Sequence, residues 1–269
     1  MNLSLSNMLS SSASGLDPDA KGYIDAVVTA GATVSATQKK AINTFVKTGK
    51  SDGWYSSLKR LYLPIWASAA PNAIDMIGLT SGTFNGTVTH SAGYVQGDGS
   101  TGFFRMTGAV SSGLTTSSNG LFALQLTAPS GTGLVGIIGN RNLSSQALQL
   151  SRINSTSIRY DTCDSSFNSL AVVLNLIDTV GIFSAQRVNT SVDIRRRTGS
   201  GVASLGGNTV AVGGTMPTVD LFAMRSIFTN NDGQFGLFGA SLGLTTAQDD
   251  VFTLALKDLW ETCTSLTLP

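Results

Sequence analysis

Residues 121–138 read LFALQLTAPSGTGLVGII, two short apolar runs separated by a segment rich in Gly, Ser and Pro. Runs of this length, bounded by turn residues, are typical of β-strands. The same pattern continues from about Leu61 to Leu244, where charged residues are sparse and turns such as GDGSTG, TGSG and NNDGQ recur. Short strands at regular spacing predict an antiparallel sandwich or barrel, so we expect a mainly β protein.

The clearest expected strands run from Gly102 to Met106, Leu121 to Thr127, Leu134 to Ile138, Ala147 to Ile153, Ser157 to Tyr160, Leu170 to Leu176, Thr179 to Arg187, Ser191 to Arg197 and Asp220 to Arg225. Gly131, Gly133 and Gly136, at the start of the strand from Leu134 to Ile138, form the pattern G-x-G-x-x-G, which is found at dinucleotide sites. That site needs a helix to open after the glycines. An apolar strand follows instead, which favours a hairpin turn.

Helical signals flank this β-rich body. Asp17 and Pro18 fit an N-cap and a first helical residue, and Gly31 fits a stop. We expect further helices from Ser35 or Thr37 to Gly49, from Asp52 to about Leu61, and from Thr245 or Thr246 through Trp260. The chain is therefore divided into a flexible arm (1–15), a helical docking unit (16–66), a β-sandwich (67–244) and a C-terminal helix and tail (245–269).

Composition narrows the function classes. Hydrophobic residues make up 42% of the 269 positions, and charged residues make up 12%, against a usual share of about 25%. A formal net charge of +1 does not indicate a nucleic-acid-binding protein, which is usually basic. The apolar run from Leu170 to Ile177 is too short to span a bilayer, and MNLSLSNMLSSSASG lacks the marks of a signal peptide. We expect no nucleic acid, no membrane insertion and no disulfide between Cys163 and Cys263.

Residues that perform catalysis are scarce. His90 is the only histidine and Glu261 the only glutamate, so neither a nucleophilic triad nor a zinc site of the usual ligands is indicated. Two aspartates could act as a glycosidase pair, but most of the candidates sit in turn-like settings. Asp98 and Asp232 could hold calcium, but a plain turn is favoured for both. The aspartates considered for hydrolysis are Asp161, Asp164, Asp178 and Asp193. We expect no enzyme activity, no metal and no cofactor.

Three sets of residues are candidates for contacts. Arg195, Arg196 and Arg197 form the one basic cluster, expected on a solvated strand face or against a partner. Aromatic residues favour interfaces, so Trp54, Tyr55 and Tyr62 are candidate docking residues, unless they pack the head against the sandwich. The loop candidates for host recognition are Asn140, Arg141, Asn142, Asn230, Asn231, Asp232 and Gln234, unless Asn and Gly serve only to make tight turns.

Several segments together resemble one group of proteins. LDPDAKGYIDAVVTAG, QKKAINTFVKTGKSDGWYSSLKRLYLPIWASAAPNAIDMIG, VQGDGSTGFF and QFGLFGASLGLTTAQDDVFTLALKDL resemble tailed-bacteriophage virion proteins. In these proteins a short helical unit precedes a concanavalin- or laminin-G-like jelly roll, and the resemblance covers most of the chain from Leu16 onward. It supplies no catalytic motif, and the lectin fold's metal and sugar ligands have no recognisable counterpart here.

The resemblance implies a virion structural protein, made in the host cytoplasm and acting in a tail fibre, a baseplate or a receptor-binding part. Its expected partners are other virion proteins, further copies of itself and a host-surface glycan. A capsid or tail decoration protein is the alternative function. A glycan-binding or glycan-hydrolysing module is the second alternative, because fold alone does not give function.

Overall fold

The computed structural model describes residues 15–108, 113–130, 135–143, 146–154, 157–162, 170–173, 180–209, 215–217, 220–225 and 229–269. Its helical elements are α1 (Pro18–Thr29), α2 (Ala36–Ser51), η2 (Tyr55–Ser57, a 3₁₀ turn), α3 (Ala69–Asn72) and α4 (Thr246–Thr264). Its strands are β1 (Leu58–Tyr62), β2 (Thr83–Asn85), β3 (Val88–Ser91), β4 (Tyr94–Gly97), β5 (Phe103–Arg105), β6 (Ser118–Gln125), β7 (Val135–Leu143), β8 (Gln146–Asn154), β9 (Ser157–Thr162), β10 (Leu170–Val173), β11 (Gly181–Val188), β12 (Ser191–Thr198), β13 (Gly201–Thr209), β14 (Phe222–Ala223) and β15 (Gln234–Ser241).

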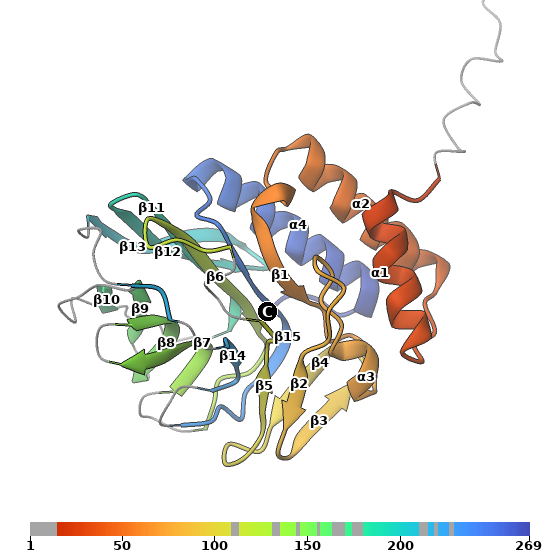
Figure 1. The fold of residues 1–269 in the computed structure, drawn as a ribbon, viewed down its shortest axis with the longest axis horizontal. Coiled ribbons are helices and arrows are strands. Elements are labelled where there is room, and N and C mark those ends of the chain that lie inside the picture. Colours follow the sequence, from red (N-terminus) through yellow and green to blue (C-terminus); the bar gives the residue numbers. More distant parts are fainter. Residues whose placement is uncertain are drawn as a thin grey trace, which may run out of the picture.

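The strands form two antiparallel sheets, which confirms the expected mainly β sandwich. The first sheet has the order β13-β12-β11-β6-β15-β4-β3, and the second has the order β10-β9-β8-β7-β14-β5-β2. β1 also pairs with β15, beyond the point where β4 stops pairing with it. Helices α1, α2 and α4 lie together on one side of this sandwich, so the first sheet is the middle layer (Figure 1).

β6 shows why the first sheet is buried on both faces. Leu121 and Ala123 point into the core between the sheets, whereas Phe122 and Leu124 point into the core under the helices. Successive side chains of a strand alternate between faces, so a strand covered on both sides is apolar throughout. The continuous apolar run LFAL therefore marks a central strand of the middle layer.

Local capping signals set the helix ends. The Asp17 side chain accepts a hydrogen bond from the Asp19 backbone N–H at 3.0 Å, and Pro18 is the first helical residue, as expected. Ser35 and Thr245 begin α2 and α4, each in a reciprocal capping box with the glutamine three residues later. Such caps contribute about 0.5–2 kcal/mol each.

The helical unit shares its core with the sandwich. Trp54 has no exposed surface, and its ring lies 5.0 Å from Phe45 of α2 and 5.2 Å from Phe252 of α4. Phe252 in turn packs at 4.9 Å against Phe122 of the first sheet. One continuous apolar cluster thus joins the N-terminal helices, the C-terminal helix and the sheet.

Two expectations about this region are corrected. The segment expected to be a third helix forms η2 and then β1, because residues 58–62 find hydrogen-bonding partners in β15. Trp54 and Tyr62 are fully buried and are not available to a docking partner. Trp54 packs the head against the sandwich, whereas Tyr62 lies in the core between the sheets, with its ring 4.7 Å from that of Phe104. Tyr55 is half-buried beside Lys50, whose ammonium lies 5.6 Å from the ring centre.

The basic cluster does not lie on a solvated face. Arg195 and Arg197 are under 10% exposed, because α4 covers them. Arg195 donates to the Thr246 carbonyl at 2.9 Å and pairs with the Asp250 carboxylate at 2.8 Å. Arg197 donates to the Asp250 carbonyl at 2.8 Å. These bonds fasten the first turns of α4 to β12.

A buried carboxylate lies beside these arginines. Asp249 of α4 has no exposed surface and accepts hydrogen bonds from the Ser184 hydroxyl at 2.5 Å and from the Gln186 amide at 3.2 Å. Burial raises its pKa to about 6, and the bond from Ser184 and the charge of Arg195 only partly oppose that rise. Asp249 is therefore a buried acid within the helix–sheet layer.

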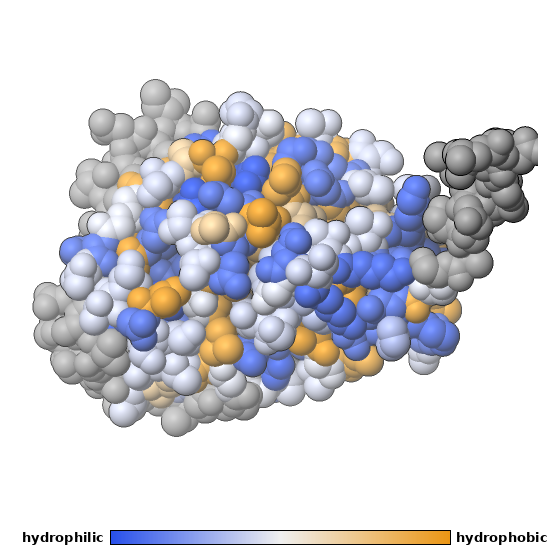
Figure 2. Space-filling model, turned by 90° about the horizontal axis from the view of Figure 1, so that it is seen from above, coloured by the Kyte–Doolittle hydropathy of each residue, from blue (hydrophilic) through white to orange (hydrophobic). Residues whose placement is uncertain are grey.

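The outer surface of the helical layer shows no broad apolar face. On the side seen in Figure 2, hydrophobic residues form small patches among hydrophilic ones. A groove of about 430 Å³ lies between α2 and α4, with Ala41, Phe45 and Leu259 among its apolar lining residues. No helix in the described ranges has the length and apolarity needed to cross a membrane.

Candidate functional site

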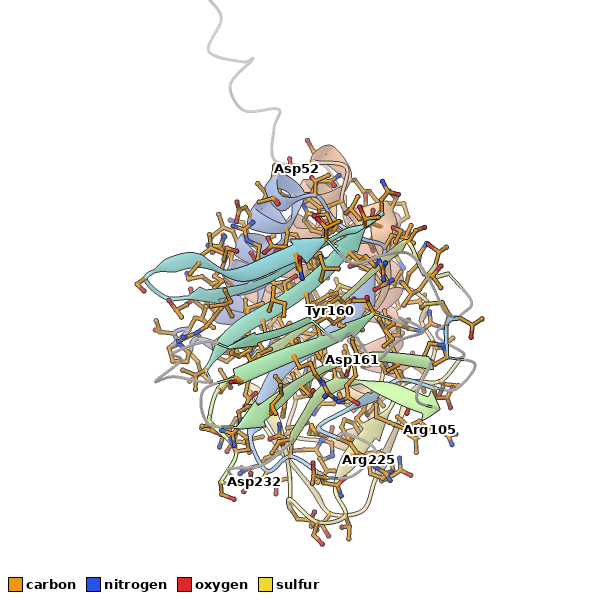
Figure 3. All side chains as sticks on the ribbon, turned by 90° about the vertical axis from the view of Figure 1, so that its left-hand side faces the viewer. Asp52, Arg105, Tyr160, Asp161, Arg225 and Asp232 are labelled. Atoms are coloured by element: carbon orange, nitrogen blue, oxygen red, sulfur yellow. The ribbon has the colours of Figure 1, made fainter. Side chains whose placement is uncertain are left out.

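The second sheet turns one row of side chains away from the core between the sheets. Strand pairing places Arg105, Phe222, Gly139, Gln149 and Asp161 side by side on neighbouring strands. The parallel row beneath it, which includes Phe104, Ala223, Ile138, Leu150 and Tyr160, lies in the core. Because neighbours along a strand alternate between faces, the first row points away from that core, and its members Gln149 and Asp161 are nevertheless buried. Figure 3 views the molecule from this side, with Arg105, Asp161 and Arg225 labelled.

A glycine interrupts the row at its centre. Gly139 has a φ of +131°, and a Cβ at this position would lie 2.3 Å from the Leu148 carbonyl oxygen. No side chain therefore stands between Phe222 and Gln149. Beyond Gln149, Asp161 pairs with Arg159 at 3.0 Å. The row thus carries aromatic and cationic groups on one side of the glycine and polar groups on the other.

Two phenylalanines and one arginine form the most distinctive group on this face. The rings of Phe103 and Phe222 meet edge to face at 5.4 Å. The Arg225 guanidinium carbon lies 4.4 Å from the centre of the Phe103 ring and 5.4 Å from that of Phe222. Arg105 and Asp220 form an ion pair at 3.4 Å next to Phe222. These five residues are called the Arg225 patch below.

The part of the chain that the structure describes holds no neutralising partner for Arg225. Among the described residues, its guanidinium takes part in no ion pair and no hydrogen bond, and its contacts are the two rings. Stacking on aromatic faces is favourable for a guanidinium and leaves the N–H groups at its edge able to donate. The patch therefore carries a half-buried cation whose described contacts are two aromatic rings.

The backbone before Arg225 is held in an uncommon conformation. Met224 is buried and has a φ of +64°, a region that non-glycine residues rarely occupy. Its N–H donates to the Ile137 carbonyl at 3.0 Å, and its carbonyl accepts from the Asn231 N–H at 2.8 Å. A bridge between Arg225 and Asn230 follows at once. Strain of this kind persists where the surroundings impose it, often at binding sites.

Asn230 and Asn231, expected to be binding residues, instead help to build this arrangement. Asn231 is fully buried, donates to the Gly136 carbonyl at 3.0 Å and accepts from the Gly233 N–H at 2.7 Å. The Asn230 amide donates to the Ser100 carbonyl. The NNDGQ turn thus positions Arg225, and Asn231 in particular cannot reach a ligand.

The remaining predicted binding residues form hydrogen bonds within the protein, or their side chains are not described by the structure. Asp232 accepts hydrogen bonds from the backbone N–H of Ser130 at 2.9 Å and from its hydroxyl. The side-chain amide of Gln234 lies 3.3 Å from that of Gln96. Asn140 is buried and donates to the Asp220 carbonyl at 2.6 Å. Arg141 and Asn142 belong to β7, but their side chains are outside the described set.

The two turn aspartates considered for calcium have other roles. The Asp98 carboxylate accepts from the backbone of Gly102, Ser100 and Thr101 and from the Thr101 hydroxyl. These bonds, the one from Gly102 foremost, hold its pKa far below the ordinary value. Within the described residues, no three His, Cys, Asp or Glu side chains gather where they could hold a metal ion.

The other chemical candidates do not meet in one site. Asp161 faces outward from the second sheet, whereas Asp193 lies on the first sheet beside Arg195. Asp164, Asp178 and Cys163 fall outside the described residues. Cys263 is a free, buried thiol whose pKa burial raises to about 12. His90 packs edge-on against Phe84 at 4.4 Å, and burial lowers its pKa.

Sequence reasoning missed the Arg225 patch. Its members come from two predicted strands, Gly102 to Met106 and Asp220 to Arg225, and more than a hundred residues separate these in the chain. The adjacent residues Phe103 and Phe104 could have indicated an aromatic ring outside the core between the sheets. Successive side chains of a strand point to opposite faces, so only one of the two rings can enter that core. The partner of the outward ring depends on sheet register, which turn signals alone do not supply.

Comparison with known proteins identifies the fold alone. No protein-family model and no curated protein sequence matches the chain. A Trypanosoma rangeli sialidase in complex with sialic acid matches with a TM-score of 0.54 and 10% identity, over 81% of this chain and 39% of the sialidase. A covalent-intermediate complex of a Trypanosoma rangeli sialidase with 2,3-difluorosialic acid matches with a TM-score of 0.54 and 11% identity, over 90% and 38%.

A third solved structure adds a different kind of protein. A botulinum neurotoxin type C structure, whose description states that cell entry depends on two ganglioside molecules, matches with a TM-score of 0.50 and 10% identity. The match covers 75% of this chain and 51% of the toxin chain. The chain thus spans about two fifths of the sialidases and about half of the toxin chain that it matches.

These likenesses correct one expectation from the sequence. We expected a protein without enzyme activity, but the solved chains that share this fold include sialidases, which are enzymes. The scarcity of histidine and glutamate is therefore no ground for setting catalysis aside. What the comparisons establish is the architecture, a sandwich consistent with the expected concanavalin-like fold.

Proposed function

We propose that the chain recognises a glycan through the outward face of its second sheet and serves a bacteriophage particle in host adsorption. The Arg225 patch is the observation that carries the binding proposal. A sugar ring has an apolar C–H face that packs on aromatic rings, and its hydroxyl groups bond to nearby charged groups. Phe103 and Phe222 provide the rings, while Arg105 and Asp220 provide a donor and an acceptor beside them.

Two further observations support this proposal. The solved structures that share the fold include a sialidase bound to sialic acid and a toxin whose description names gangliosides, and both of these molecules contain sugars. These ligands belong to those proteins, and the shared fold makes a glycan the first ligand class to test for this chain. The role in a phage particle rests on the sequence segments that resemble virion proteins.

The expected result is that Phe222→Ala weakens glycan binding by about tenfold or more, because covering a phenylalanine side chain contributes up to about 1.5–3 kcal/mol. The measurement uses an array of bacterial surface polysaccharides and animal glycans, followed by calorimetry on the best binder. Tyr94→Ala is the matched control, since Tyr94 is a half-buried aromatic residue of the first sheet.

Each outcome decides something. A folded Phe222→Ala protein with unchanged affinity would move the site away from this face, and a wild-type protein that binds no glycan would remove the proposal. Sugar released from the bound glycan would show hydrolysis in addition to binding. Particles that lack the protein and still adsorb normally would instead support a decoration role.

A further inference from the structure

We infer that the ligand of the Arg225 patch is an acidic sugar, whose carboxylate the Arg225 guanidinium binds. This inference rests on the proposed glycan-binding function and goes one step beyond it. A neutral sugar needs aromatic faces and hydrogen-bonding groups, and the patch would satisfy it without a second arginine. The feature that a neutral sugar leaves unexplained is the cation of Arg225.

The first argument concerns charge. Three other arginine side chains form ion pairs with a carboxylate: Arg105 with Asp220, Arg159 with Asp161, and Arg195 with Asp250. Arg225 has only the two phenylalanine rings among the described residues. A half-buried guanidinium without a counter-charge is a site that favours an anion.

The second argument concerns geometry. The guanidinium carbon lies 4.4 Å from the centre of the Phe103 ring and 5.4 Å from that of Phe222, and these two contacts restrict the positions open to the guanidinium. A guanidinium edge binds a carboxylate through two parallel hydrogen bonds. Rings beside that edge can pack against the C–H face of the sugar that carries the carboxylate. The patch therefore joins the two features of an acidic sugar, a carboxylate and an apolar ring face.

The third argument concerns rigidity. Arg225 follows Met224, whose left-handed backbone is fixed by hydrogen bonds to Ile137 and Asn231. The next backbone pairing, with Asn230, holds Arg225 itself. Binding through a side chain that is already ordered loses less conformational entropy than binding through a mobile one. A strained and clamped segment that ends in a cation without a counter-charge among the described residues is thus suited to recognising a fixed anion.

The test compares pairs of glycans that differ only in the carboxylate. Suitable probes are 3′-sialyllactose with its carboxyl-reduced form and trigalacturonate with its carboxyl-reduced form, with binding measured by calorimetry. We expect at least one acidic member to bind about ten- to a hundredfold more tightly than its reduced form. Arg225→Met should remove that preference while leaving the affinity for the reduced form within about twofold.

Further variants keep the result interpretable. Arg225→Lys retains the charge but loses the planar fork, so it should keep only part of the preference. Lys39→Met removes an exposed cation from α2 and should bind like the wild type. Equal binding of both members of each pair would overturn the acidic-sugar inference and leave glycan binding intact. If the protein binds neither member of any pair and no glycan on the array, both the acidic-sugar inference and the glycan-binding proposal are overturned.

Discussion

A chain that begins at Leu61 is expected not to form a soluble, folded monomer. The N-terminal helices contribute Tyr23, Ile24, Phe45 and Trp54 to the cluster that also holds Leu237 of the first sheet, all of them buried. Removing residues 15–60 would expose the rest of this cluster. Each large apolar side chain that loses its burial gives up about 1.5–3 kcal/mol, against a total stability of about 5–15 kcal/mol for a typical protein.

Loss of β1 strengthens this expectation. Leu58 and Arg60 pair with Ser241 and Ala240 of β15, so the truncated chain would leave part of a central strand without its neighbour. Unpaired strand edges favour aggregation. Size-exclusion chromatography and thermal unfolding of the chain 61–269 provide the measurement. The control is the chain 15–269, which keeps every described residue. A monomeric chain 61–269 that unfolds cooperatively would show that the helical unit is a separate domain.

A second expected result concerns pH. The pKa of Asp249 is raised from 3.8 to about 6, chiefly by burial, so the folded protein holds this proton more tightly than the unfolded chain does. Stability from this group is therefore greatest at low pH and declines as the pH rises from about 4 to about 7. At about 1.4 kcal/mol for each tenfold change in affinity for the proton, the decline is about 3 kcal/mol.

The variant Asp249→Asn separates this contribution from those of other groups. An amide keeps an acceptor for Ser184 and has no proton to lose, so the difference in free energy of unfolding between the variant and the wild type should grow with pH. The charged neighbours of Asp249 are Arg195, Asp193 and Asp250. Urea unfolding at several pH values measures the difference.

Asp258→Asn on the exposed side of the same helix is the control for the loss of one negative charge. A constant difference between Asp249→Asn and the wild type from pH 4 to pH 7.5 would mean that Asp249 titrates as it does in the unfolded chain. In that case burial under α4 would not control its ionisation.

Features set by neighbouring residues could be predicted from the sequence. Asp17 with Pro18 starts α1, and Ser35 and Thr245 start α2 and α4, because a cap needs only residues within one turn. Most predicted strands coincide with observed ones for a similar reason, since turn residues on both sides limit them. The alternative reading of the NNDGQ asparagines as turn formers matches the bonds of Asn231.

Features set by distant residues could not be predicted in the same way. Trp54, Leu58 and Leu61 have helical spacing. Residues 58–62 nevertheless form a strand, because they pair with β15, which lies far along the chain. Strand preference depends strongly on such context. The partners of Arg195 and Arg197 could not be predicted for the same reason. They include backbone carbonyls of α4, and only the packing of α4 on β12 brings them close.

The joining of α2 and α4 in one helical layer has a consequence for how the protein is made. The Gln38 amide donates to the carbonyl of Cys263, which is 225 residues further along, and α2 packs against α4. Contacts so distant in sequence slow folding, because a long loop must close before they form. On the ribosome, α2 is synthesised long before α4. The face of α2 that packs on α4 therefore stays without this native partner until α4 has been made, and exposed apolar surface of this kind is what chaperones protect.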